Sequence, residues 1–169
     1  IDIAADDPRR PAFDANRQAE IEAVKPVIER LKETGWTFGS HTWGHIRLDS
    51  RPLESVQRDT VRWAEEVGSL VGPTNILFYP HGGRPDGDDW HSTGPVFQYL
   101  QSQGFRIFAS VGINSFSYIK KDISAVICDR LHPDGTTLRN GKALEWYSQF
   151  YDAREIIDLD VRPDLGVTW

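Results

Sequence analysis

Apolar side chains recur at helical spacing along residues 16–34, where they fall three or four positions apart. These positions are Ile21, Val24, Ile28 and Leu31. The spacing predicts an amphipathic helix that ends at Gly35. Pro26 lies inside this stretch, and because its ring removes a backbone donor, we expect it to kink or split the helix.

A second helical pattern begins near Ser50, with Pro52 in its first turn, a position that proline favours. Its apolar residues form one stripe: Leu53, Val56, Trp63, Val67 and Leu70. We expect this stripe to face the core and the helix to close at Gly72-Pro73. Trp63, and Trp146 in a later helix, are therefore interpreted as core residues.

Short apolar runs bounded by turn residues predict strands around these helices. The predicted strands are residues 1–5, 36–40, 76–80, 105–111, 124–130 and 155–161, and further helices are predicted at 96–103 and 142–152. This alternation is typical of a single α/β domain with a mainly parallel sheet, open or closed. In such folds functional residues collect at the carboxyl ends of strands, where the segments 40–45 and 79–83 both lie.

Charge and cysteine content narrow the possible classes of protein. The formal net charge of -6 argues against nucleic acid as the main partner, because phosphate binding needs concentrated Lys and Arg. The one cysteine, Cys128, excludes an internal disulfide and a thiolate zinc cluster. No apolar run approaches the roughly 18 to 20 residues of a membrane span, and no signal peptide is recognised.

His41 and His45 stand four positions apart, directly after a predicted strand. Imidazole is the commonest side-chain ligand for zinc, and this spacing lets two rings converge on one ion if the segment makes a helical turn. A zincin protease is excluded, because it needs a glutamate directly after the first histidine, where this chain has Thr42. The alternative is a strand-end turn in which one histidine caps the backbone and the other is exposed.

Three segments carry a family resemblance. Residues 33–45 end in Gly-Ser-His-Thr-Trp-Gly-His, residues 76–82 read Ile-Leu-Phe-Tyr-Pro-His-Gly, and residues 101–105 read Gln-Ser-Gln-Gly-Phe. Together they resemble the polysaccharide deacetylase family (the NodB homology domain, carbohydrate esterase family 4). The resemblance implies that residues 1–169 form a distorted (β/α) barrel. That barrel would be incomplete at its N-terminal end, because the Thr-Phe-Asp-Asp motif of the family's first strand is not found.

The resemblance also implies a chemistry: a metal-dependent hydrolase that removes acetyl groups from N- or O-acetylated sugars or polysaccharides. In such a site His41 and His45 would hold a divalent metal, most consistent with zinc, together with an aspartate. A second aspartate would act as general base and a later histidine as general acid. Asp7, in the pair Asp6-Asp7, is the nearest candidate carboxylate, and His132 is the candidate acid, although Pro-Asp-Gly after it also fits a plain turn.

Four residues are candidates for contact with the saccharide. The resemblance implies that Tyr79 and Pro80 shape the acetyl pocket. His81 either contacts the substrate or is an ordinary loop histidine. Trp43 lies inside the histidine motif, where its ring could stack on the apolar face of a sugar.

The missing aspartates leave a second hypothesis open. Without them the chain would be a catalytically inactive, deacetylase-like carbohydrate-binding domain or a fragment. An incomplete barrel would also expose a sheet edge, which favours association into a homo-oligomer. The resemblance favours a secreted or cell-envelope location.

Overall fold

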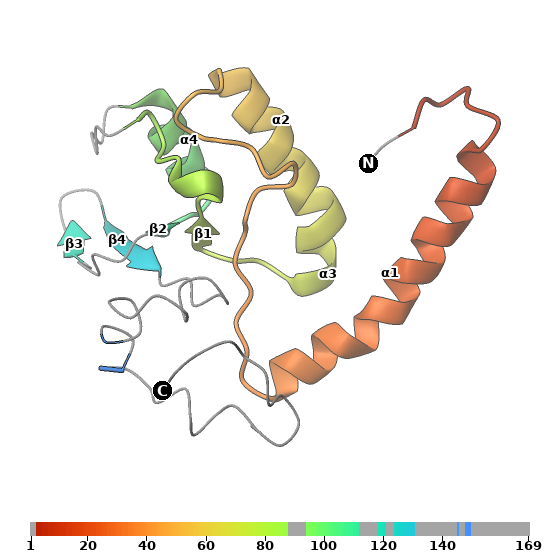
Figure 1. Cartoon of the computed structure of the whole chain (residues 1–169), viewed down its shortest axis with the longest axis horizontal. Coiled ribbons are helices and arrows are strands. Elements are labelled where there is room, and N and C mark those ends of the chain that lie inside the picture. The colour runs from red at the N-terminus through yellow and green to blue at the C-terminus, as the bar shows by residue number, and fades with distance from the viewer. Residues whose placement is uncertain are drawn as a thin grey trace.

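The computed structural model describes residues 3–87, 94–111, 118–120 and 124–130, together with Glu145, Ser148 and Gln149. Its helices and strands are shown in Figure 1. The helices are α1 (Arg10–Glu33), α2 (Leu53–Trp63), the π-helical turn η1 (Ala64–Gly68), α3 (Ser69–Val71), the 3-10 turn η2 (Pro80–Gly82) and α4 (Pro95–Ser102). The strands are β1 (Ile76–Phe78), β2 (Ile107–Val111), β3 (Tyr118–Lys120) and β4 (Ala125–Arg130).

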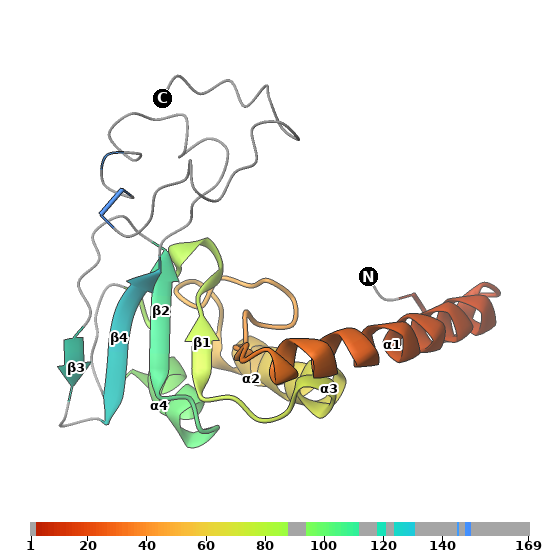
Figure 2. The same cartoon turned by 90° about the horizontal axis from the view of Figure 1, so that it is seen from below.

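The strands form one sheet in the order β1-β2-β4-β3. β1 pairs in parallel with β2 and β2 with β4, whereas β3 runs antiparallel to β4 (Figure 2). On the other side of β1, Ser40 makes a single parallel bridge to Leu77. The prediction of a mainly parallel α/β sheet is thus confirmed, while the described strands do not show a barrel.

Helices α2 and α4 pack against the sheet and enclose the hydrophobic core. Leu77 of β1 lies opposite Phe108 of β2, so both side chains project from the same face. There they join Val56 of α2 and Phe97 of α4 in one cluster, with the rings of Phe97 and Phe108 4.8 Å apart. Burying this apolar surface away from water is the main force that holds the sheet and the two helices together.

Helix α1 differs from α2 and α4, because it lies along the side of the molecule and projects beyond it (Figures 1 and 2). Its one buried residue is Ile28. The helix begins at Arg10, earlier than predicted, and is continuous through Pro26, so of the expected kink or split the split does not occur. Residues 22–27 are exposed, and water can therefore satisfy the carbonyl that loses its partner at the proline.

The second predicted helix is present as a continuous helical stretch of α2, η1 and α3, and it ends at Gly72, whose φ of 92° suits only glycine well. Within it, η1 is a π-helical turn that the apolar pattern did not predict. No helix among the described residues combines the length and the apolar character that a membrane crossing requires.

Three strand predictions need correction or fall outside the structure. The strand predicted at 36–40 is reduced to the bridge at Ser40, and at the other end of the segment Trp36 is 67% exposed. Residues 3–5 of the predicted first strand form irregular chain and the start of a turn. Strand β3 was not predicted. The elements predicted at 142–152 and 155–161 lie outside the described residues, except for the three named above.

Candidate functional site

Three imidazole rings lie side by side at the carboxyl ends of the parallel strands. His41 and His45 belong to the loop after the Ser40 bridge, and His81 belongs to η2, just after β1. The ring centroids of His41 and His45 are 4.9 Å apart, and those of His45 and His81 are 4.4 Å apart. The two segments expected at this edge of the sheet therefore meet there.

His41 is held in one orientation by the neighbouring strand. Its Nδ1 lies 2.8 Å from the carbonyl oxygen of Phe78. A carbonyl can only accept, so Nδ1 carries the proton and Nε2 keeps a free lone pair. Partial burial lowers the pKa of His41, as do the charge of Arg130 and the two other imidazoles, while the Phe78 carbonyl opposes the shift. The neutral ring that results is the form that binds a metal ion.

The backbone of this site is strained at three positions. Thr42, His45 and His81 have φ values of 61°, 51° and 56°, in the left-handed region that residues other than glycine seldom adopt. Such strain persists only where surrounding contacts enforce it, and it is concentrated at functional sites. One of these contacts is the Thr42 hydroxyl, which accepts a hydrogen bond of 3.1 Å from the backbone N–H of Ile46.

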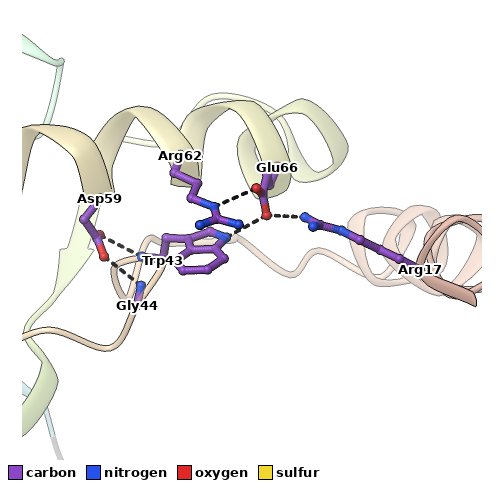
Figure 3. A network of polar contacts seen from close by, with 6 residues as sticks. All are labelled: Arg17, Trp43, Gly44, Asp59, Arg62 and Glu66. Carbon is purple, nitrogen blue, oxygen red and sulfur yellow. Dashed lines mark hydrogen bonds and ion pairs between the residues drawn. The ribbon is translucent and has the colours of Figure 1, made fainter. Parts of the chain in front are cut away.

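Helix α2 holds the turn between the two motif histidines through Asp59 (Figure 3). One carboxylate oxygen of Asp59 accepts the backbone N–H of Trp43 at 2.8 Å, and the other accepts that of Gly44 at 2.7 Å. The sequence interpretation missed Asp59. The sequence nevertheless contains a signal for the role of Asp59, because this acidic residue lies between Val56 and Trp63 on the buried face of the helix.

The side chain of Trp43 is fixed by charged residues of α2, η1 and α1 (Figure 3). Its Nε1 donates a 2.8 Å hydrogen bond to Glu66, and the guanidinium of Arg62 lies 3.6 Å from the ring centroid. Glu66 also accepts hydrogen bonds from Arg62 and from Arg17. One face of the indole is thus covered by the guanidinium of Arg62.

Burial and hydrogen bonding act in opposite directions on Glu66. Burial works to raise the pKa of this carboxyl, but hydrogen bonds from Arg62, Trp43 and Arg17 outweigh it and lower the pKa below its ordinary value. Glu66 is therefore ionised at neutral pH, and its charge keeps the Trp43 indole and both guanidiniums in place.

Tyr79 and Pro80 differ from the expectation that they line the acetyl pocket. Tyr79 is 0% exposed and belongs to the hydrophobic core, with its ring 6.3 Å from that of Phe108, and Pro80 is also fully buried. The reason is register, since Tyr79 directly follows β1, two positions after Leu77, and its side chain joins the same core cluster as Leu77 and Phe108. These two residues position the exposed His81 that follows them.

One of the two predicted catalytic residues, Asp7, is described by the structure, and it does not join the histidines. Asp7 lies in the turn before α1, where its carboxylate accepts hydrogen bonds from the backbone N–H and the guanidinium of Arg9, which lower its pKa. His132 lies outside the described residues. Among the residues that are described, no three His, Cys, Asp or Glu side chains are grouped so that they could hold a metal ion. Within the described part of the chain, His41 and His45 are thus suited to a metal, and no carboxylate or thiol is grouped with them.

Charged residues of β4 also lie at this edge of the sheet. Asp129 faces Arg84 of the loop after η2, with 3.9 Å between the nearest atoms. The guanidinium of Arg130 lies 6.0 Å from the ring centroid of Phe78, whose carbonyl anchors His41. Of these charged residues, Arg130 acts on His41 and contributes to the lowering of its pKa, while Arg84 faces Asp129.

Comparison with known proteins places the chain in a family. Residues 12–105 match the model of the polysaccharide deacetylase family, and this range is more than half of the chain. The chain therefore belongs to the polysaccharide deacetylase family. No curated protein and no solved structure matches it significantly. The matched range contains His41, His45 and His81, and it contains neither Asp7 nor His132.

Proposed function

We propose that this chain acts as a metal-dependent hydrolase that removes acetyl groups from N- or O-acetylated sugars or polysaccharides. Membership of the family indicates deacetylase activity in general and an acetylated carbohydrate as substrate. The observation that carries the finer proposal is the pair His41 and His45. The His41 ring is anchored through Nδ1 on Phe78, so that its Nε2 is available beside the second imidazole.

The imidazole nitrogens of His41 and His45 are the proposed ligands of a divalent cation. Neutral imidazole suits zinc well, so zinc is the favoured ion. When bound, such a cation supplies Lewis-acid chemistry, in which it polarises a carbonyl and lowers the pKa of water. Partial burial of His41 keeps the ring neutral and ready to bind at neutral pH.

The remaining roles are distributed over the surrounding residues. His81 lies against His45 and is exposed, so it is the proposed contact to the bound saccharide. Trp43 offers the ring face not covered by Arg62 to a sugar. By resemblance to the family, His132 is the proposed general acid. Asp7 stays a candidate for the catalytic carboxylate, although its described partner is Arg9.

One observation favours a second candidate, a catalytically inactive domain that binds carbohydrate. The described residues bring three imidazoles together, and no carboxylate among these residues joins them in a group that could hold a metal ion. Two imidazoles alone hold zinc weakly, and without a base water is not activated. Saccharide binding without deacetylation would then be the function of the same surface.

Zinc binding by the purified chain, beside the double variant His41→Ala/His45→Ala, tests the proposal. We expect the parent chain to bind close to one zinc ion and to release acetate from acetylated chito-oligosaccharides or an acetylated chromogenic ester. The double variant should lose both properties while it keeps its circular dichroism spectrum.

His81→Ala is the matched control, because it removes a neighbouring imidazole that is not a proposed ligand. It should retain zinc and raise KM for the saccharide. A parent chain that binds no zinc would refute the metal-dependent hydrolase. Saccharide binding without acetate release would instead favour the inactive carbohydrate-binding domain.

A further inference from the structure

The backbone of the turn between His41 and His45 is fastened to α2 by the buried carboxylate of Asp59. Asp59 is 9% exposed, and its two oxygens accept the N–H groups of consecutive residues, Trp43 and Gly44, at 2.8 and 2.7 Å (Figure 3). Hydrogen bonds from backbone N–H groups to an ionised carboxylate are shorter and stronger than those between neutral groups. The two bonds therefore determine where this turn lies relative to the helix.

Gly44 makes this close approach possible. A Cβ atom at this position would lie 3.1 Å from the Asp59 oxygen, tighter than most such contacts. With a larger residue, the turn or the carboxylate would have to shift by a few tenths of an ångström. The small residue and the carboxylate thus fit each other, although they are far apart in sequence.

The position of Asp59 is itself determined by the core. Its neighbours on the same face of α2, Val56 and Trp63, are buried at 1% and 8% exposure. This packing fixes the helix, and the helix fixes the carboxylate. His41 is anchored independently from the other side by the carbonyl of Phe78 in β1. The histidine pair is therefore held between the sheet and α2.

We infer that Asp59 is a positioning residue that sets the separation of the His41 and His45 imidazoles and thereby their affinity for a divalent cation. The inference rests on the proposed function. Asp59 touches neither the cation nor the substrate in this scheme, and it acts through the backbone of Trp43 and Gly44. Residues that orient metal ligands from outside typically change metal affinity by about 10- to 100-fold when they are replaced.

Asp59→Asn tests the inference with little change of shape. The amide keeps one acceptor oxygen, but its NH2 group faces the second backbone N–H, which then has no acceptor. We expect zinc affinity, measured by chelator competition, to fall about 10- to 100-fold. Amide hydrogen exchange of Trp43 and Gly44 in the metal-free variant should become faster.

Asp86→Asn is the matched control. Asp86 also accepts two consecutive backbone N–H groups, those of Val96 and Phe97 at 3.1 and 2.8 Å, but it caps α4 instead of the histidine turn. This variant should lose stability and keep the zinc affinity of the parent chain. If Asp59→Asn does not fold, Gly44→Ala provides a second variant, which crowds Asp59 and should lower zinc affinity in the same direction.

The outcomes separate this inference from the proposed function. Parent-like zinc affinity and unchanged amide exchange in Asp59→Asn would overturn the positioning role. An equal loss of affinity in Asp59→Asn and Asp86→Asn would also overturn it, since general destabilisation would then explain the effect. A parent chain without zinc binding refutes the proposed function and the effect on metal affinity, while amide exchange still decides whether Asp59 holds the turn.

Discussion

The two helices on either side of the histidine motif use their polar residues in different ways. In α1, ion pairs such as Lys25 with Glu22 and Lys32 with Glu29 join residues of the same helix at exposed positions. In α2 and η1, Asp59 and Glu66 bond to the motif loop itself. The comparison shows that the number of charges on a helix says little about function. What matters is whether a charge lies on the face that packs against the site.

Apolar residues show the same contrast. Val56 of α2 is 1% exposed within the core cluster, whereas Val27 of α1 is 54% exposed. The helix that fixes the motif is thus fixed by the core, while α1 is attached by few contacts. One link between them is Arg17, which reaches from α1 to Glu66 (Figure 3).

The largest expected effect is a difference in the free energy of unfolding when the same substitution, Val to Ala, is made in each helix. Val56→Ala removes two buried methyl groups and leaves a cavity, so it should lower the free energy of unfolding by about 2 kcal/mol. Val27→Ala should change it by less than about 0.5 kcal/mol, because the side chain is exposed and alanine favours a helix. Urea denaturation of both variants checks this. Equal effects would show that α1 is packed as tightly as α2.

A smaller difference in the free energy of unfolding is expected between substitutions of two glutamates, Glu66 of η1 and Glu29 of α1. Glu66→Ala removes the acceptor for Trp43, Arg62 and Arg17, and should lower the free energy of unfolding by about 1 kcal/mol. Glu29→Ala, which removes a pair within α1, should change it by at most about 0.5 kcal/mol. Because the pKa of Glu66 is lowered from 4.5, its contribution is present above that pH and is lost as pH falls below it. If the two variants cannot be distinguished at neutral pH, the Trp43 network does not stabilise the fold.

The smallest expected effect concerns the pH dependence of the metal-free chain. The pKa of His41 is lowered from 6.5 in the folded state, so below pH 6.5 the unfolded chain binds the proton more readily. Stability should therefore decrease as pH falls below 6.5. Thermal melts of the parent chain and of His41→Gln, recorded above and below this pH, isolate the contribution of His41 to the pH dependence of stability. His45 and His81 are present in both chains. A parallel pH dependence in the two chains would contradict it.

Several parts of the fold could be predicted because they depend on neighbours in sequence. The apolar spacing of α2 and the short runs at β1, β2 and β4 are local patterns, and each appears in the structure close to its predicted place. The unbroken α1 and the loss of the strand at 36–40 were not predictable in this way. Both depend on whether the surrounding residues are covered or exposed, which is decided by distant segments.

The candidate site likewise has features that the sequence predicted and features that it did not. The spacing of His41 and His45 after an apolar run was visible in the sequence, and so was the family. The burial of Tyr79 was not, because only the register of β1 shows that its side chain faces Phe108 and the core. The approach of His81 to His45 likewise follows from strands that are adjacent in space and distant along the chain.

The sequence by itself therefore determined the α/β class, the histidine pair and membership of the polysaccharide deacetylase family. Only the tertiary structure decided what holds the pair: the Phe78 carbonyl on one side and the Asp59 carboxylate on the other. The physical reason is the range of the interactions. Helix and strand patterns arise between residues a few positions apart, whereas these hydrogen bonds form only after core packing has brought β1 and α2 to the same loop.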